Sequence, residues 1–250
     1  MSDFGRATPR FAVVVPVAPG RDPLVMRSLE QQDEPRSTYE VVVERGLNVS
    51  RNRNNCIGRT RAPIFAFTDD DCVVERQWLA SARRFFEAHP EFDAVGGPQL
   101  NLEGEGALGR AIGRALASRF GTARTRHRFR RGPARWNATQ CDLTSANLFV
   151  TRAAFDRWGP FDDRLWPNEE TALLRRIELG GGRIAYDPSI VVRHRRRDSL
   201  RRLAGQCFGY GRGRARQWNI EGRRGLSLEQ SIPCAFLLYC ATLPLSAAMW

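Results

Sequence analysis

Three consecutive carboxylates, Asp69 to Asp71, follow the apolar run 63–68 (PIFAFT). Such a run is typical of a buried strand, and alternate strand side chains share a face, so we expect Asp69 and Asp71 on one side and Asp70 on the other. Two carboxylates at the carboxyl end of a strand form half of a site for Mg²⁺ or Mn²⁺. Phosphate oxygens and water fill the other coordination positions of the ion. The alternative is a solvated acidic loop that caps the next helix, but the strand context favours a metal site.

A second acidic pair, Glu169 and Glu170, opens a helix that we predict over 169–179, with Asn168 as its cap. Carboxylates in a first helical turn are ordinary complements of the helix dipole. A chemical role requires one of them to act as a general base on an acceptor hydroxyl. His194 ends the last predicted strand, ahead of three arginines, and is either a further metal ligand or an exposed side chain.

All 39 basic residues are arginine, and against 27 acidic residues they give a net charge of +12. Guanidinium groups fork onto phosphate and carboxylate oxygens, so phosphate-bearing partners are indicated, although coding bias alone can also produce such a composition. Arg212 and Arg214 lie in the glycine-spaced segment 209–215, which we expect to be flexible and suited to a diphosphate or to anionic lipid head groups.

A sequence pI near 10.7 also invites a nucleic-acid-binding protein. That class explains the arginines but not an acid triplet at a strand end, which would repel phosphate without a metal, so we expect no nucleic-acid partner. The 250 residues are 42% apolar and 26% charged, which excludes a disordered chain. Six cysteines without a CxxC pair indicate neither a zinc site nor a disulfide framework.

Strands that alternate with helices position these residues. Apolar runs predict strands, and helical spacing or capping residues predict helices; 48–60 is polar and compatible with a helix. The predicted strands are 11–17, 39–43, 63–68, 94–97, 145–150 and a pair within 183–194 broken at Pro188, and the predicted helices are 22–32 and 77–88 besides 169–179. We expect 104–132 to be a mobile helix-loop segment. The alternation indicates a doubly wound α/β layer with its ligand site at the carboxyl ends of the strands.

The last twenty residues, 231–250, carry no charge and as a helix would span about 30 Å. The arginine-dense stretch 193–224 precedes them and would lie on the cytoplasmic side. We therefore expect a catalytic domain over 1–225 and an apolar tail over 226–250 that lies in or on the bilayer at the cytoplasmic face. A buried core helix is the alternative.

The order of these motifs resembles the family 2 glycosyltransferases with the GT-A fold, over roughly residues 10–218. The resemblance rests on FAVVVPV, NVSRNR, IFAFTDDD, SANLFV and NEETALLR. It is strongest toward succinoglycan-type exopolysaccharide glycosyltransferases, because PNEETALLR, DPSIVV, RDSLR and YGRGR follow in the same order. The resemblance implies a Rossmann-like mixed sheet flanked by helices, a nucleotide-diphospho-sugar donor, Mg²⁺ or Mn²⁺, and a glycan or lipid-linked acceptor.

Site residues carry over from the family position by position. Asp69 and Asp71 match the acids that hold the nucleotide ribose and the metal-diphosphate, with Asp70 between them. Glu170 occupies the place of the catalytic base, normally Asp, and Glu169 precedes it. The remaining donor-side matches are Arg51 and Asn52 in the Ala-Arg-Asn segment, Pro16 and Ala18 beside the base, and Glu44 in place of the family's base-reading Asp.

The resemblance implies metal-dependent transfer of a sugar to a hydroxyl with inversion. Asp69, Asp71 and His194 would hold the cation, Arg212 or Arg214 would help to stabilise the departing diphosphate, and Glu170 would take the acceptor's proton. A second reading is a catalytically silent, transferase-like, membrane-associated protein, because Glu170 replaces Asp and the base-reading loop is shortened.

Overall fold

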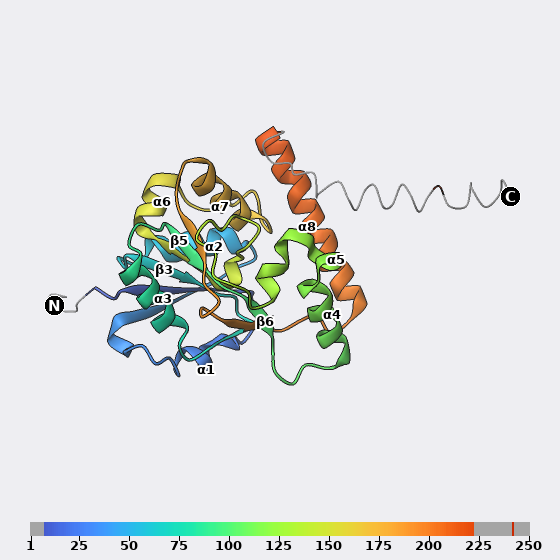
Figure 1. The fold of residues 1–250 in the computed structure, drawn as a ribbon, viewed down its shortest axis with the longest axis horizontal. Helices are drawn as coiled ribbons and strands as arrows, with labels where there is room; N and C mark the ends of the chain where they lie inside the picture. Colours follow the sequence, from blue (N-terminus) through green and yellow to red (C-terminus); the bar gives the residue numbers. More distant parts are fainter. Residues whose placement is uncertain (1–7, 223–241, 243–250) are drawn as a thin grey trace.

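The computed structural model describes residues 8–222 and Thr242 (Figure 1). The tail predicted over 226–250 therefore lies outside the described residues, apart from Thr242. Within the described part of the chain, no helix is both long enough and apolar enough to cross a bilayer.

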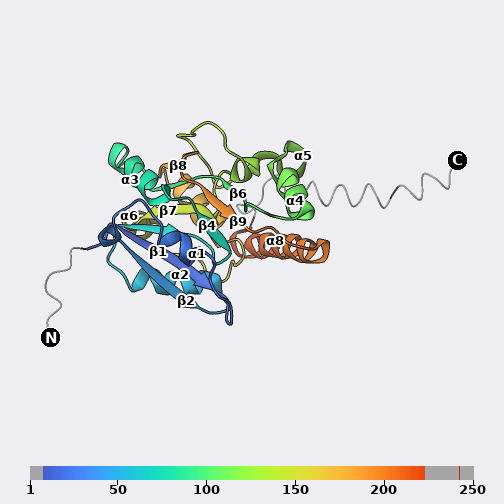
Figure 2. The same ribbon diagram turned by 90° about the horizontal axis from the view of Figure 1, so that it is seen from below.

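A six-stranded mixed sheet forms the centre of the molecule (Figure 2). Its strands, in spatial order, are β2 (Tyr39–Arg45), β1 (Phe11–Val17), β3 (Ile64–Phe67), β7 (Leu148–Thr151), β5 (Ala94–Gly96) and β8 (Ile184–Tyr186). Strand β7 runs antiparallel to both of its neighbours, and the other pairs are parallel. The site predicted at the carboxyl ends therefore lies where β1 and β3 end side by side.

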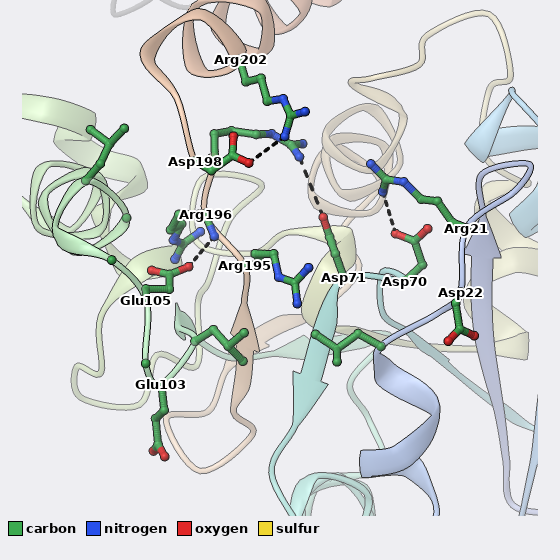
Figure 3. A pocket seen from close by; sticks show the side chains of 17 residues that line it. Arg21, Asp22, Asp70, Asp71, Glu103, Glu105, Arg195, Arg196, Asp198 and Arg202 are labelled. Atoms are coloured by element: carbon green, nitrogen blue, oxygen red, sulfur yellow. Dashed lines mark hydrogen bonds and ion pairs between the residues drawn. The ribbon is translucent and has the colours of Figure 1, made fainter.

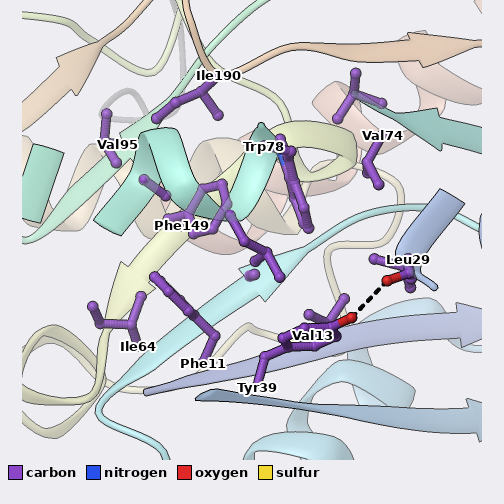
Figure 4. Close-up of a cluster of buried hydrophobic side chains, with 14 of the residues drawn as sticks. Phe11, Val13, Leu29, Tyr39, Ile64, Val74, Trp78, Val95, Phe149 and Ile190 are labelled. Carbon is purple, nitrogen blue, oxygen red and sulfur yellow. Dashed lines mark hydrogen bonds between the residues drawn. The ribbon is translucent and has the colours of Figure 1, made fainter. Parts of the chain in front are cut away.

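Helices cover both faces of this sheet, which explains why its strands β1 and β3 are apolar throughout. Helices α1 (Val25–Leu29) and α3 (Trp78–Ala88) pack on one face, while α2 (Val49–Gly58), α6 (Arg152–Trp158) and α7 (Glu169–Leu179) pack on the other. Along β1, Phe11 and Val13 belong to the first core (Figure 4), and Ala12 and Val14 belong to the second. The alternation follows from the two-residue period of a strand.

A second, three-stranded sheet lies beside the first, in the order β4 (Cys72–Val74), β9 (Val192–His194) and β6 (Gln99–Asn101). The sequence predicted the strands on the two sides of Pro188 as a pair. They instead belong to different sheets and do not pair with each other. Antiparallel pairing aligns Cys72 with His194. This register brings His194 next to the acid triplet, 123 residues earlier in the chain.

The remaining helices flank the second sheet on one side of the molecule (Figure 1). They are α4 (Ala107–Ala117), α5 (Arg119–Thr122), a 3-10 helix over Ala123–Phe129, and α8 (Leu200–Glu221). The glycine-spaced segment 209–215, predicted to be flexible, lies inside α8. Gly213 permits close packing there, since a Cβ atom at this position would lie 3.2 Å from Pro167 Cδ.

Other element predictions are confirmed within a few residues, with local corrections. The helix predicted over 22–32 is limited to α1, whose first residue is tied to the acid triplet, because the Val25 N–H donates to the Asp70 carbonyl oxygen at 3.4 Å. Asn168 precedes α7 but does not cap it, since its amide donates to Gln217 Oε1 of α8 instead. Short 3-10 helices occupy Arg36–Thr38 and Ser145–Asn147, so β7 begins three residues later than predicted.

Candidate active site

A cavity of about 650 Å³ opens at the carboxyl ends of β1 and β3 and is bordered by α8. Eight sequence-predicted site residues line it, namely Pro16, Ala18, Asp69, Asp70, Asp71, Glu169, Glu170 and His194. They come from four separate parts of the sequence. The fold therefore brings the acid triplet, the second acidic pair and the histidine to one cavity.

The acid triplet forms a turn between β3 and β4 rather than the end of a strand. The Cys72 N–H donates to the Asp69 carbonyl oxygen at 3.2 Å, which closes the turn. Because the turn does not follow the strand period, all three carboxylates line the cavity, and the expectation that Asp70 points away is wrong.

Asp70 is nearly buried and has one satisfied oxygen and one unsatisfied oxygen. Its Oδ1 accepts from Arg21 Nη1 at 3.2 Å (Figure 3), whereas Oδ2 has no hydrogen-bond partner among the described residues. Burial raises the pKa of Asp70, and the neighbouring charge of Asp71 adds to that shift. An adjoining cavity of about 620 Å³ shares Asp70 and Asp71 with the first.

Asp71 and His194 meet across the pairing of β4 with β9. Asp71 Oδ1 lies 2.8 Å from His194 Nε2, and Asp71 Oδ2 lies 3.9 Å from Arg197 Nη1. Burial alone would raise the pKa of Asp71, but the hydrogen bond and charge of His194, together with Arg197, outweigh it and lower the pKa to about 2. Asp71 is therefore ionised at any pH near neutrality.

The Asp71–His194 pair has the chemistry to hold a divalent cation. Ligand atoms of Asp71, Cys72 and His194 lie within 4.8 Å of one another. Cys72 is buried, and burial raises its pKa well above the ordinary value, so its thiol stays protonated and is a poor ligand. One carboxylate and one imidazole remain, and this leaves positions for phosphate oxygens and water, as Mg²⁺ and Mn²⁺ require. Asp69 is not part of this group.

Arg53, which the sequence reasoning missed, occupies the centre of the site. Its side chain is only 2% exposed; Nη2 donates to Asp69 Oδ1 at 2.9 Å, and Nη1 forms an ion pair with Glu169. Burial raises the pKa of Glu169, and the Arg53 guanidinium opposes that shift. The available signal was helical spacing, since Arg53 is four residues from Val49 and both side chains line the cavity.

The two adjacent glutamates have different environments. Both line the cavity, but Glu169 is buried and held by Arg53, whereas Glu170 is half-buried and forms no ion pair with a described residue. A general base needs a carboxylate that a substrate can reach. Glu170 meets this requirement, and Glu169 instead helps to fix Arg53.

The structure places three other predicted donor residues outside the cavity. Arg51 is exposed and pairs with Asp163 at 3.0 Å, and Asn52 donates to the Gly46 carbonyl oxygen at 3.0 Å. Glu44 accepts from Asn55 and Arg59 of α2. These contacts hold α2 against its surroundings. Successive residues of a helix point in different directions, so Val49 and Arg53 face the cavity while Arg51 and Asn52 do not.

Helix α8 contributes different arginines from those predicted. Arg212 and Arg214 do not line the cavity, and Arg214 Nη1 instead donates to Gln217 Oε1 at 3.3 Å. The lining residues are Arg202, Gln206 and Tyr210, which recur every four residues on one face of α8. Because the segment 209–215 is helical, the four-residue spacing decides which side chains of α8 face the cavity.

A mixed sheet between two helical layers, with an acidic turn and a histidine in one cavity, defines the GT-A class of fold. Among solved structures, a mannosyltransferase from Pyrobaculum calidifontis, in complex with GDP-Man and Mn²⁺, superposes with a TM-score of 0.63 at 17% identity, over 97% of this chain and 79% of that one. Staphylococcus aureus TarS 1–349 gives 0.57 at 15% identity, over 84% and 66%.

The chain belongs to the family described as glycosyltransferase like family 2, whose model matches residues 6–213. The pre-mycofactocin glycosyltransferases of two Mycobacterium tuberculosis strains are 28% identical to it over 160 residues, which is 64% of this chain. That region is 32% of the relatives, so the match spans about a third of their length. The likeness to succinoglycan-type enzymes stays a prediction.

Proposed function

We propose that the protein transfers a sugar from a nucleotide-diphospho-sugar to an acceptor hydroxyl with inversion of the anomeric configuration. The observation that carries the proposal is one cavity in which Glu170, free of ion pairs within the described chain, shares the lining with the Asp71–His194 pair. A reachable carboxylate and a half-site for a cation are the two parts that this reaction needs.

Asp71 and His194 would hold Mg²⁺ or Mn²⁺. When bound, the cation supplies positive charge toward the oxygens of the donor's diphosphate. A relative of this fold has been solved with GDP-Man and Mn²⁺, which supports the same use here. Arg21, Arg197 and Arg202 line the cavity and add positive charge for the diphosphate, in the role first assigned to Arg212 and Arg214.

Other side chains of the cavity position the site and accept the proton. Arg53 fixes Asp69 and Glu169 and so sets the position of the turn relative to the start of α7. Glu170 accepts the proton of the acceptor hydroxyl while that oxygen forms the new glycosidic bond and the nucleoside diphosphate departs. A single displacement with one base inverts the anomeric carbon. Pro16 and Ala18 border the cavity where the nucleotide base is expected.

The acceptor side of the proposal rests on sequence. A lipid-linked or polysaccharide glycan acceptor accounts for both the arginine-rich surface and the uncharged stretch 231–250. On this proposal the protein works at the cytoplasmic face of a membrane, with the tail in or on the bilayer. Flotation with vesicles, comparing the full chain with a chain ending at residue 225, tests the location; equal flotation of the two would contradict the role of the tail.

The decisive experiment is a donor-hydrolysis and transfer screen of nucleotide sugars with Mn²⁺ or Mg²⁺. For Glu170→Gln we expect unchanged nucleotide affinity and turnover reduced by roughly 10²–10⁴, the usual scale for a lost general base. Glu178→Gln is the matched control, because Glu178 lies exposed on the same helix. Asp71→Asn should abolish the turnover that depends on the cation.

Three results would oppose the proposal. Absence of nucleotide binding in calorimetric titration with Mn²⁺ would favour the catalytically silent alternative. Equal turnover of Glu170→Gln and wild type would contradict the role of Glu170 as the base. A product with retained anomeric configuration, read by proton NMR, would refute the single displacement.

A further inference from the structure

The segment 106–141 carries most of the protein's excess charge. It contains nine arginines and neither aspartate nor glutamate, which gives +9 of the total +12. The segment forms α4, α5, the 3-10 helix over Ala123–Phe129 and the loop that follows. Like charges so concentrated repel one another, so a function for them requires an anion nearby.

Part of this segment surrounds a cavity of about 450 Å³. Arg119, Arg126, His127, Arg135, Thr139 and Asp142 are among its lining residues. It shares no lining residue with the candidate active site. It is therefore a separate site, with Asp142 as the one acidic residue among those that line it.

Asp142 is already engaged by its surroundings. Its Oδ2 accepts from the Thr139 backbone N–H at 2.9 Å and from Thr139 Oγ1 at 3.2 Å, and its Oδ1 lies 3.3 Å from Arg135 Nε. The side chains of Arg119 and Arg126 form no ion pair within the described residues. One buried carboxylate thus faces more positive charge than it can balance.

Three buried nitrogens of the cavity have no hydrogen-bond partner in the described structure, namely Arg126 Nε, His127 Nδ1 and Arg135 Nε. Of these, Arg135 Nε has its ion-pair contact with Asp142, whereas Arg126 Nε and His127 Nδ1 have no such contact. His127 Nε2 lies 3.4 Å from Arg135 Nη1, and because a guanidinium only donates, Nε2 is the acceptor. The imidazole proton therefore lies on Nδ1, which becomes a donor like Arg126 Nε. Burial and the charge of Arg135 lower the pKa of His127, which is consistent with a neutral ring.

We propose that this cavity binds a phosphate group. Several guanidinium groups, an unpartnered N–H on Arg126 and another on His127 converge on a space that holds little negative charge of its own. Phosphate supplies both the charge and the several acceptor oxygens that such donors need, and arginine forks match its geometry. The group belongs either to a soluble phosphate compound or to a lipid head group.

Phe120 distinguishes these two sources. It lies on α5, next to Arg119, and its side chain is fully exposed. An exposed aromatic residue beside arginines inserts at the head-group level of a bilayer. If the phosphate belongs to a lipid, Phe120→Ser should weaken binding to vesicles, whereas it should leave the binding of a soluble phosphate unchanged.

The test is calorimetric titration of the full chain with inorganic phosphate and with pyrophosphate in EDTA, together with flotation on vesicles containing phosphatidylglycerol. The test variant is Arg119→Gln/Arg126→Gln. The control is Arg27→Gln/Arg61→Gln, which removes two exposed arginines elsewhere and gives the same net charge. We expect the test variant to bind one of the probes at least about tenfold more weakly than the control, the effect of losing charge-assisted hydrogen bonds.

Donor hydrolysis by the same variants separates this proposal from the proposed function. Both double variants should retain the wild-type rate, because neither pair of arginines lines the active-site cavity. Equal binding of all three probes by the test and control variants would overturn the proposal, as would the failure of wild type to bind any of them. The binding result stands whether or not a donor is found.

Discussion

The Arg53 ion pairs provide the sharpest test of the site's electrostatics. Arg53 is buried between Asp69 and Glu169, and Glu169 is itself buried. Arg53→Met keeps much of the side-chain volume and removes the charge. Asp69 is partly exposed and can be solvated, so the cost falls mainly on Glu169, which must either remain ionised without a partner or take up a proton.

The magnitude follows from the pKa of Glu169, which burial raises from its ordinary value of 4.5 to about 7 while Arg53 is present. A raised pKa means that, between the unfolded and the folded pKa, the Glu169 carboxyl is protonated in the folded state and ionised in the unfolded state. The free energy of unfolding therefore falls as pH rises through this window, and it is level above the folded pKa. In wild type this loss is complete near pH 7. Without Arg53 the folded pKa rises further, and stability continues to fall by about 1.4 kcal/mol per pH unit. Between pH 7 and about 8.5 the variant should lose about 2 kcal/mol that wild type keeps.

The assay is urea unfolding followed by tryptophan fluorescence at three pH values from about 5.5 to 8.5, where the linear extrapolation gives the free energy of unfolding. Arg53→Met/Glu169→Gln is the control, because it has no buried carboxyl left to titrate. The extra pH dependence should be present in the single variant and absent from the double variant. A single variant whose destabilisation is the same at every pH, or a double variant with the same slope, would refute the reasoning.

Three further predictions concern the scaffold. Burial raises the pKa of Cys56 to about 11, so its labelling by iodoacetamide at about pH 8 should be at least ~100-fold slower than that of exposed Cys207 and should become faster as pH rises. Mass spectrometry maps the labelled positions, and comparable rates at the two cysteines would contradict this prediction. Asn147→Ala removes three buried side-chain hydrogen bonds and should destabilise the protein by about 2–4 kcal/mol in urea unfolding; a loss below about 1 kcal/mol would show that the network relaxes. Gly97→Ala would place a Cβ 2.0 Å from a backbone oxygen and should cost about 1–3 kcal/mol or more, whereas Gly58→Ala, with nothing within 4 Å, should be neutral or stabilising by thermal unfolding.

Much of the central fold could be predicted from local pattern. The apolar run 11–17 is β1 without change, and the helical spacing in 77–88 gives α3 to within one residue. Strand β1 is buried on both faces and α3 is buried on the face that packs on the sheet, so their hydrophobic patterns are strong. The helix predicted over 22–32 failed because a contact with the acid triplet, distant in sequence, sets where α1 begins.

The site could be predicted only in part. The acid triplet and His194 were found because charge or a histidine at the end of an apolar strand is unusual. Glu169 and Glu170 were found as an acidic pair at a helix start that matches the family's base position. All of these residues line the cavity. Arg53 was missed because, among 39 arginines, its helical spacing from Val49 is a weak signal that does not show which arginine side chain becomes buried. Arg212 and Arg214 were selected because their glycine spacing indicated a flexible segment, whereas the segment is a helix.

The sequence by itself determined the alternation of strands and helices, the family and the types of residue at the site, because hydrophobic period and unusual charges are local properties of the chain. The tertiary structure decided how those charges are paired. The register of β4 with β9 brings His194 to Asp71, and the packing of α2 on α7 joins Arg53 to Glu169 and leaves Glu170 open to the cavity. Such pairings depend on distances between segments more than a hundred residues apart, which only the packed sheet and its helices set.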